Sequence, residues 1–564
     1  MPLLPGDRVV EGQLREAYQS VTIRSWLIAL VALGAGLRLW QYFGNTAIWL
    51  DEVAIARNIL DRSLWQLLTS PLAYDQAAPR GFLLVEKVAV SVFGSSDYVL
   101  RFFPLISSLI ALVVFWRIVA RWLEGLPGLA ALALFATAAP HVVFASEVKP
   151  YSFDVAVAML LLWLALDLRG LDLSVQKGLR VGIAGGVLVW FSLPSVLVVF
   201  AIGVSLILFS LNDRQQVPGG RLRVLAMTLG LWFASALVSA LVGLAGTTAS
   251  TKEYMHRYWA VGFPPVPISS IAKTLWPWDQ LERLLGKGGP ASLIYPVPKI
   301  YFALIVLGFV VLWSRDRILT ASLLAPIGLT LAAAFARQYP FSDRLILFLT
   351  PSFFVAIGES SEQIRQWVSR WSKPLGVLVS VLVTSSAVYP MAKTPPVYHL
   401  EDMKPVLAFM QERRRPNDSV YAYYGAAPEV SFYAGAFGLR DNAYAVGGCH
   451  RGDSRRYFEE IDMFRGRPRV WLLITHALYR EREDILHYLD TIGLRLDSLV
   501  MKSRFPGRSD SPAEVFLYDL SDPVRLSQAT SVSSPVTGPS SANARYGCGE
   551  GPQTIVPSRG LATR

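Results

Sequence analysis

The chain has 564 residues, of which 53% are hydrophobic and 17% are charged, and its mean hydropathy is +0.39. Its apolar residues gather in runs of about 17–25, the length that crosses a hydrocarbon layer of about 30 Å as a helix. A soluble enzyme of this composition would need helices that are apolar on every face, which excludes that class. The net charge of +11 comes largely from Lys and Arg beside the apolar runs. The sequence has no basic stretch interleaved with aromatic residues, so it does not indicate a nucleic-acid partner.

The apolar runs predict a mainly helical membrane protein with about eleven transmembrane helices. The first run, 24–43, follows a polar segment over 1–23 and is not followed by a small-residue cleavage site, so it is typical of a retained span. The others lie near 98–119, 127–145, 150–167, 180–194, 195–211, 224–245, 299–314, 318–336, 345–358 and 374–391. Pro194 divides the pair within 180–211, where one long kinked helix is the alternative to two short spans.

Basic residues mark every second loop, and this bias places those loops and the 1–23 segment in the cytoplasm. The basic loops contain Arg117 and Arg121; Arg169, Lys177 and Arg180; Arg214, Arg221 and Arg223; Arg315 and Arg317; and Arg365, Arg370 and Lys373. The loop 44–97, the turn 146–149, the loops 246–298 and 337–344 and the C-terminal third then lie on the outer, periplasmic side of the inner (plasma) membrane.

Two regions on that outer side have structure of their own. The loop 44–97 contains helix-like segments over 51–68 and 80–95. The second has an apolar stretch of 14 residues with Glu86 and Lys87 in its middle, which suits a helix in the membrane interface. From 394 to 522, amphipathic helical patterns (401–414, 453–466, 480–493) alternate with strand patterns (419–425, 469–476, 498–503, 513–520), which predicts a small α/β domain.

The tail 523–564 is rich in Ser, Pro, Gly and Thr and is predicted to be disordered. The chain has two cysteines, Cys449 and Cys548, and whether they pair is left open. The stretch GGCHRGD, which contains Cys449 and His450, is more typical of a glycine-rich turn than of a metal site. The sequence contains no P-loop, GxGxxG after a strand, HExxH or GxSxG motif.

The acidic pair Asp51–Glu52 directly follows the first span. A carboxylate at the bilayer centre costs about 3 kcal/mol, so the pair belongs at or above the outer boundary. There it is a candidate general base toward a hydroxyl group, or a pair of oxygen ligands for a divalent cation. The alternative is that both acids only stabilise the first turn of a following helix.

Two further clusters fall on the same side of the membrane. The stretch ASEVKPYSFD brings Glu147, Lys149 and Tyr151 to the end of a span, with Pro150 favouring a turn before a new helix. The stretch YPFSDRLILFLTP contains Tyr339, Asp343 and Arg344 at the beginning of another span. An outer Arg344, like Arg101 in SSDYVLRFFP, opposes the positive-inside bias, so each is either a phosphate ligand or an arginine that reaches lipid headgroups.

These stretches together resemble the GT-C class of membrane glycosyltransferases. The runs WLDEVAIARNILDRSLWQLL, DQAAPRGFLLVEK, FG…YVLRFFP and ASEVKPYSFD are most similar to the bacterial group of lipopolysaccharide-core and lipid A sugar transferases and protein O-mannosyltransferases. The resemblance covers most of 24–391, so 24–393 is predicted to be a GT-C-like catalytic domain. It implies an enzyme that takes a sugar from a polyprenyl-phosphate carrier and transfers it, with inversion, to a lipid, glycan or protein acceptor at the outer membrane face.

The resemblance also implies roles for individual residues. Asp51 matches the acidic catalytic position and Glu52 its neighbour, while Glu147, Lys149 and Tyr151 match the second outer motif, in which Arg is commoner than Lys149. Arg344 matches the basic residue that holds the donor phosphate. Tyr339 and Arg101 are further candidates for donor binding, as is Lys87. A divalent metal on Asp51 and Glu52 is left open. The outer C-terminal domain is expected to help present the acceptor.

Two other classes of function remain as alternatives. A secondary transporter would place ionisable groups near the bilayer midplane, whereas the informative acids here gather at one boundary. In a non-catalytic membrane protein of glycan assembly, Asp51 and Glu147 would lie far apart, because groups that act on one small ligand must lie close together.

Overall fold

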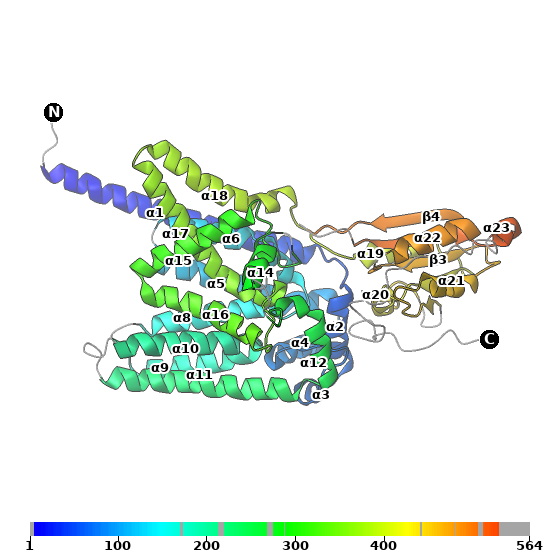
Figure 1. Ribbon diagram of the computed structural model, residues 1–564, viewed down its shortest axis with the longest axis horizontal. Coiled ribbons are helices and arrows are strands. Elements are labelled where there is room, and N and C mark those ends of the chain that lie inside the picture. The colour runs from blue at the N-terminus through cyan, green and yellow to red at the C-terminus, as the bar shows by residue number, and fades with distance from the viewer. Residues whose placement is uncertain are drawn as a thin grey trace.

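The computed structural model describes residues 5–528, except 124, 170–172, 213–218, 268–273, 287, 440–442, 479 and 506–510. Figure 1 shows a bundle of long helices lying alongside one another, with a small sheet region projecting from one end. The first helix, α1 (Pro5–Phe43), begins well before the predicted span, so much of the segment 1–23 continues the same helix.

Within the part of the chain that the structure describes, six helical segments are long and apolar enough to cross a membrane, which makes this a multi-pass membrane architecture. They are Thr22–Phe43 of α1, α5 (Asp97–Trp122), Gly220–Ala245 of α11, α15 (Pro298–Arg315), α16 (Arg317–Phe335) and the continuous Asp343–Ser369, made of η4 (Asp343–Leu349) and α17 (Thr350–Ser369). The bent pair Leu126–Thr137 and Ala139–Ser146 is a seventh candidate. The expected count of eleven spans stays a prediction.

Every predicted span nevertheless coincides with helix. At the predicted spans, the helices outside those six segments are α6 (Leu126–Thr137), α7 (Ala139–Val143), η1 (Phe144–Ser146), α8 (Tyr151–Asp167), α9 (Val175–Leu188), η2 (Val189–Phe191), α10 (Ser195–Asn212) and α18 (Lys373–Lys393), and the whole of α11 runs over Gly219–Ala245. The expected break at Pro194 is confirmed, because α10 begins at the next residue and is a separate helix from α9.

A buried arginine supports the bend between α6 and α7. Pro140 has no N–H to continue the helix, and the chain bends by 54° there. Arg38 is fully buried, and its guanidinium donates to the carbonyl oxygens of Phe135 (3.4 Å) and Ala136 (3.1 Å) and to Ser108 Oγ (2.9 Å). The bend therefore keeps its carbonyl groups bonded inside the bundle, as apolar surroundings require.

The outer loop forms three helices at the sheet end of the bundle (Figure 1): α2 (Leu50–Asp61), α3 (Leu64–Thr69) and α4 (Arg80–Phe93). The two predicted helical segments are therefore present, the first divided in two at Arg62–Ser63. The later outer loop adds α12 (Ala249–Tyr258), η3 (Ala260–Gly262) and α14 (Trp276–Leu285).

The C-terminal region is a five-stranded mixed sheet in the order β2-β1-β3-β5-β4. Its strands are β1 (Ser419–Ala422), β2 (Ala445–Val446), β3 (Val470–Ile474), β4 (Leu494–Met501) and β5 (Ala513–Asp519), and its helices are α19 (Met403–Arg413), α20 (Ala427–Tyr433), α21 (Ser454–Asp462), α22 (Glu481–Ile492) and α23 (Pro523–Gln528). β1 pairs in parallel with β2 and β3, whereas β5 is antiparallel to both of its neighbours. The predicted helices and strands are confirmed, but the sequence patterns missed α20, β2 and α23.

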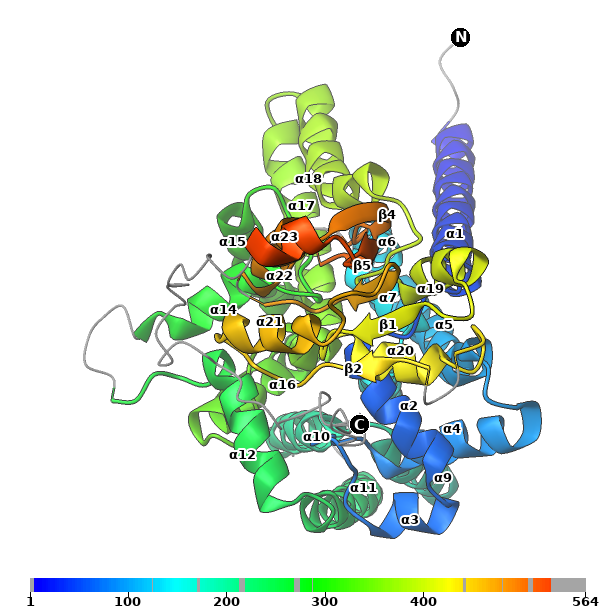
Figure 2. The same cartoon turned by 90° about the vertical axis from the view of Figure 1, so that its right-hand side faces the viewer.

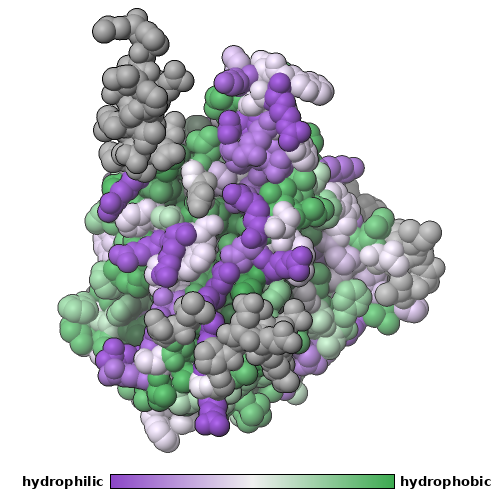
Figure 3. Space-filling view, turned by 90° about the vertical axis from the view of Figure 1, so that its left-hand side faces the viewer, coloured by the Kyte–Doolittle hydropathy of each residue, from purple (hydrophilic) through white to green (hydrophobic). Residues whose placement is uncertain are grey.

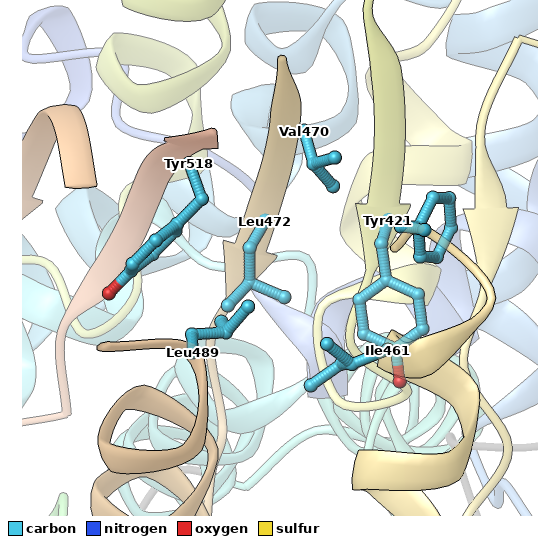
Figure 4. Close-up of a pocket in the computed structure, with 7 residues that line it drawn as sticks. Tyr421, Ile461, Val470, Leu472, Leu489 and Tyr518 are labelled. Atoms are coloured by element: carbon cyan, nitrogen blue, oxygen red, sulfur yellow. The ribbon is translucent and has the colours of Figure 1, made fainter. Parts of the chain in front are cut away.

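One face of the sheet packs on α21 and α22. Figure 4 shows Tyr421, Leu472 and Tyr518 from three strands pointing toward Ile461 and Leu489 from these helices. The cavity that remains between them is only about 10 Å³, so this core is closed to any ligand.

The other face of the sheet shares a hydrophobic core with the outer loop. Val53 and Ile59 of α2 cluster with Leu407 of α19, Val430 of α20 and Val515 of β5, all of them buried. Figure 2, which views the molecule from the sheet side, shows α20 beside α2. Buried side chains from both sides of the expected domain boundary at 394 therefore share one apolar core.

The segment predicted to be a disordered tail begins with a short helix in the structure. Residues 523–528 form α23, because Asp522 Oδ1 accepts from Val524 N (2.9 Å) and Arg525 donates to Gly493 O (2.7 Å). The rest of the tail, including Cys548, lies outside the described residues. Cys449, which packs beside α21 and α22, is not a free thiol.

The opposite end of the bundle carries the basic loops. Arg169 pairs with Asp316 (2.8 Å) and Arg315 pairs with Glu359 (2.6 Å) across neighbouring helices. In Figure 3, which views this end, hydrophilic side chains cross the face among apolar ones. The basic loops and the outer-loop acids thus occupy opposite ends, as the topology derived from sequence requires.

Candidate functional site

The site is built around the first turn of α2. Asp51 and Glu52 are its second and third residues, so the helix-start interpretation of this pair is correct as local structure. Their side chains, however, enter different surroundings. Asp51 is partly exposed and faces two buried cations, and Glu52 is completely buried.

Asp51 is held by two positive charges from distant segments. Its Oδ1 accepts from Lys149 Nζ and its Oδ2 from Arg344 Nη2, each at 2.9 Å, and the Asp51 side chain is 17% exposed. Burial alone would raise the pKa of the Asp51 carboxyl, but the two cations outweigh it and hold that pKa below its usual value. Asp51 is therefore ionised throughout the physiological range.

Glu52 forms a closed buried pair with Arg101. The guanidinium donates to both carboxylate oxygens, at 2.9–3.2 Å, and its remaining N–H groups reach the carbonyl oxygens of Thr46 and Ala47. Glu52 Oε1 also accepts from Val148 N at 2.7 Å. This pair ties the start of α2 to the turn at 147–149, and each of the three guanidinium nitrogens of Arg101 already donates to an acceptor within the protein.

The turn at 147–149 comes from a break between helices. Glu147 is extended, and α8 begins directly after Pro150, as the sequence predicted. The chain therefore presents Glu147 and Lys149 beside α2 and not along a helix. Lys149 Nζ also donates to Gln76 Oε1 (2.9 Å), and burial lowers its pKa while Asp51 opposes that shift.

Glu147 differs from the other two acids in having no partner. It is buried, and none of the described residues forms a hydrogen bond or ion pair with its carboxyl group. Burial, and then the neighbouring Glu52 carboxylate, raise the pKa of Glu147 to about 8. The carboxyl group is consequently neutral at pH 7, and it lies close enough to Asp51 and Arg344 for their charges to act on its pKa.

Arg344 lies in a cage of aromatic rings at the beginning of η4. Its guanidinium carbon is 5.1–5.9 Å from the ring centres of Tyr151, Tyr258 and Trp259, and one of its nitrogens donates to Tyr258 Oη (3.3 Å). Arg344 is 6% exposed, and its Nε is buried without a hydrogen-bond partner among the described residues. A buried donor left unbonded is costly, so this N–H is available to bind an acceptor from a ligand.

A close backbone approach fixes that aromatic cage. Phe341 N donates to Gly262 O (2.8 Å), and a Cβ at Gly262 would lie 2.8 Å from Pro340 Cβ. The glycine thus lets the loop that contains Trp259 pack against the segment before Arg344.

A cavity of about 660 Å³ adjoins the site. Residues of α10, α11 and α16, most of them apolar, form its walls. Its rim is basic, with Arg80, Lys252 and Arg337. Gln76, the hydrogen-bond partner of Lys149, and Tyr339, five residues before Arg344, also line it, so the cavity lies next to the groups around Asp51.

The remaining predicted residues have mixed placements. Tyr339 lines the cavity, although its hydroxyl donates to Leu345 O (2.8 Å). Lys87 does not belong to the site. Its ammonium donates to the carbonyl oxygens of Ile59 (2.8 Å) and Leu60 (3.2 Å) and so ends α2, because the last carbonyl groups of a helix lack internal donors.

The acids do not fit a divalent metal ion as they are arranged. Both oxygens of Asp51 accept from cations, and Glu52 is saturated by Arg101 and Val148. No group of three or more His, Cys, Asp or Glu side chains with metal-binding geometry occurs among the described residues. No step is therefore assigned to a metal here.

Sequence reasoning missed several contributors. Gln76 belongs to the DQAAPR stretch but was not predicted as a site residue. Neither were Tyr258 and Trp259, which belong to the aromatic run YMHRYW. His476, which follows β3, is close enough to add to the positive potential that lowers the pKa of Asp51. No pattern in the sequence pointed to His476.

No protein-family model and no curated protein matches the chain. Among solved structures it is similar to ArnT from Cupriavidus metallidurans in the apo state (13% identity, TM-score 0.36, 88% of this chain and 98% of that one). The same protein bound to undecaprenyl phosphate gives 14% identity and a TM-score of 0.35, over 87% and 98% of the two chains. The Archaeoglobus fulgidus oligosaccharyltransferase complex with Zn and sulfate gives 12%, 0.45, 88% and 73%. At these values the site residues are assigned from their geometry alone.

Proposed function

We propose that this chain is a GT-C-type glycosyltransferase of the plasma membrane. It takes a sugar from a polyprenyl-phosphate carrier and transfers it, with inversion, to a lipid, glycan or protein acceptor at the outer face. The observation that supports this most strongly is Asp51, an ionised carboxylate held between Lys149 and Arg344, close to a large apolar cavity that Gln76, the partner of Lys149, helps to line.

The cavity suits an amphiphile with an anionic head. Its walls come from helices of the membrane bundle, so a long hydrocarbon chain would exchange lipid surroundings for apolar protein at little cost. The cations Arg80, Lys252 and Arg337 stand at its mouth, where a phosphate would emerge. A free sugar or a soluble nucleotide sugar has no hydrocarbon chain to pack against these apolar walls, which favours a lipid-linked donor.

Charge at the site favours a phosphate. Asp51 is a single carboxylate facing two cations, Glu52 is neutralised by Arg101, and Glu147 is neutral at pH 7. The site therefore carries excess positive charge, and the unbonded Nε of Arg344 is a donor ready for a phosphate oxygen.

In the proposed reaction an acceptor hydroxyl attacks the anomeric carbon of the donor sugar. Asp51 accepts the proton of that hydroxyl as the new C–O bond forms. The bond between the anomeric carbon and the phosphate oxygen breaks, and its electron pair leaves with the polyprenyl phosphate. Arg344 and Lys149 stabilise the charge on that phosphate, in the manner of other preorganised donors.

The lowered pKa of Asp51 has a consequence for this step. An ionised base is always available, but it is weak, so the proton moves when bond formation has made the attacking oxygen acidic. Inversion requires the base and the leaving phosphate on opposite faces of the sugar. Asp51 can meet that requirement if the phosphate binds on the Nε side of Arg344, away from the Nη2 that holds Asp51.

The test compares two charge-matched variants of α2. Asp51→Asn removes the proposed base, and Asp61→Asn neutralises an exposed acid at the other end of the same helix. Lipids and surface glycans of cells that carry each variant, or lack the protein, are compared by mass spectrometry. The proposal predicts a glycan product that disappears without the protein and with Asp51→Asn but persists with Asp61→Asn.

Two outcomes would count against it. A product that persists with Asp51→Asn would remove the assigned base. An unchanged lipid and glycan profile in cells lacking the protein would instead favour a transporter or a non-catalytic assembly protein.

A further inference from the structure

Three backbone N–H groups just before Asp51 are bound by side chains from the C-terminal region. Ala47 N donates to Asp402 Oδ1 (2.9 Å), Ile48 N to Tyr433 Oη (2.7 Å) and Leu50 N to Glu429 Oε1 (2.9 Å). These acceptors are more than 350 residues away along the chain. The segment that joins α1 to α2 is thus attached to the sheet region almost residue by residue.

Helix α2 depends on these acceptors because its own N-cap residue does not provide a side-chain acceptor. The first N–H groups of a helix have no partner inside the helix and are usually bonded by a Ser, Thr, Asp or Asn at the N-cap. The N-cap of α2 is Trp49, whose side chain has no acceptor oxygen. Glu429, at the start of α20, provides the acceptor for the first helical N–H in its place.

The three acceptors are themselves rigidly held. Asp402, Glu429 and Tyr433 are all buried, and Tyr433 Oη donates to Asp97 Oδ2 (2.6 Å) while it accepts from Ile48. Burial, and then the Glu401 carboxylate, raise the pKa of Glu429 well above its usual value, so its carboxyl group is neutral at physiological pH. The shared hydrophobic core of α2, α19 and α20 surrounds them.

None of these side chains touches the ionised oxygens of Asp51, and their effect on it is therefore indirect. Asp51 follows Leu50 directly, and its carboxylate must keep its place between Lys149 and Arg344. A shift of about 1 Å in a reacting group is enough to cost on the order of 10²-fold in rate.

From this geometry we propose that Asp402, Glu429 and Tyr433 form a positioning clamp that aligns Asp51 for transfer. The C-terminal region is then part of the catalytic architecture, and not only a platform for the acceptor. The inference rests on the proposed function of Asp51, but the clamp itself is a structural claim that is tested separately.

The first test measures the clamp without any reaction. Full-length protein in detergent is compared by amide hydrogen exchange as wild type, Glu429→Ala, Tyr433→Phe and Ser431→Ala. Ser431 lies on α20 between the two clamp residues and contacts Arg57, but it does not contact 47–50. We expect exchange in the 47–52 peptide to rise about 5–10-fold for Glu429→Ala and Tyr433→Phe, the loss of one buried hydrogen bond, and not for Ser431→Ala.

The second test measures transfer. Glu429→Ala is expected to lower kcat about 10–10²-fold with little change in the KM for the lipid-linked donor, whose binding groups lie elsewhere. Glu429→Gln, which keeps an acceptor oxygen for Leu50 N and mimics the neutral acid, should restore most of the loss. A purely structural role would not distinguish Gln from Ala in kcat alone.

The two proposals fail in different ways. Unchanged exchange at 47–52 in both clamp variants would overturn the clamp, whatever the protein catalyses. Increased exchange with unchanged kcat, or an equal loss of kcat in Ser431→Ala, would overturn its role in positioning. Transfer that survives Asp51→Asn would overturn the proposed function and leave the exchange result standing.

Discussion

Asp51 and Glu52 are neighbours in the same helical turn, but the regions around them differ. Around Glu52 every charge has a partner. Arg101 binds both carboxylate oxygens of Glu52 and also donates to the carbonyl oxygens of Thr46 and Ala47, and Val148 N donates to Glu52 Oε1. Around Asp51 the groups do not balance. Two cations share one carboxylate, Arg344 Nε lacks an acceptor, and Glu147 has no partner among the described residues.

The difference separates stability from function. A fully bonded buried pair fixes a structure, because removing either member leaves the other charge unpaired. A site whose charged groups are not all paired within the protein can still bind a ligand.

Glu52→Gln should affect folding most strongly. It leaves Arg101 buried with an uncompensated charge, and breaking a buried pair from one side costs about 3–5 kcal/mol. We expect a large drop in the thermal unfolding midpoint of the detergent-solubilised protein. Replacing both partners, as Glu52→Leu with Arg101→Met, should recover much of it. A midpoint equal to that of wild type in Glu52→Gln would contradict the closed-pair interpretation.

Arg344→Lys should affect catalysis with less effect on folding. Lysine keeps the charge near Asp51 but loses the fork of donors and the stacking against Tyr151, Tyr258 and Trp259. We expect kcat/KM for the lipid-linked donor to fall about 10²–10³-fold, the cost of removing one donor from a developing negative charge. Arg337→Lys, at the rim of the same cavity, is the matched control and should change it far less.

Glu147 should control the pH dependence. Above pH 8 its carboxyl group ionises and reduces the positive charge of the site, so the KM for the anionic donor should rise across that pH. Because its folded pKa is raised above the unfolded value, its contribution to stability is complete below about pH 4.5 and is lost as pH rises toward 8. Glu147→Gln should flatten both profiles. Identical profiles in the two proteins would show that Glu147 does not titrate there.

Lys149→Arg is expected to have the smallest effect. Lys149 acts as a point charge on Asp51 Oδ1 and Gln76 Oε1, and arginine can reach the same two oxygens. We expect less than about a tenfold change in kcat/KM, whereas Lys149→Met should lose more. An equal loss in the two variants would show that the shape of the ammonium group, and not its charge, matters at this position.

The sequence predicted the parts of this site that depend on local chemistry. Hydrophobic runs located the helices, Pro150 located the turn that presents Glu147 and Lys149, and the loop charges placed these residues on the same side of the membrane as Asp51. The same topology put Asp51 and Arg344 at one end of the bundle, and their ion pair is what the structure adds.

The contacts that depend on packing between distant segments were not predictable in this way. Lys87 and Arg101 looked like free outer cations, but one binds the end of α2 and the other binds Glu52. Glu429 and Tyr433 lie in α20, a helix of seven residues that is too short to show a periodic pattern. Their role arises because Trp49 has no side-chain oxygen that could accept from the first N–H groups of α2.

The central claim is that Lys149 and Arg344 bind the donor phosphate while Asp51 performs the proton transfer. Binding of undecaprenyl phosphate to wild type and Asp51→Asn, measured side by side by native mass spectrometry, tests it most directly. Asp51→Asn frees both cations from their carboxylate, so binding should be retained or tightened even though transfer is lost. Binding that disappears with Asp51→Asn would contradict the account.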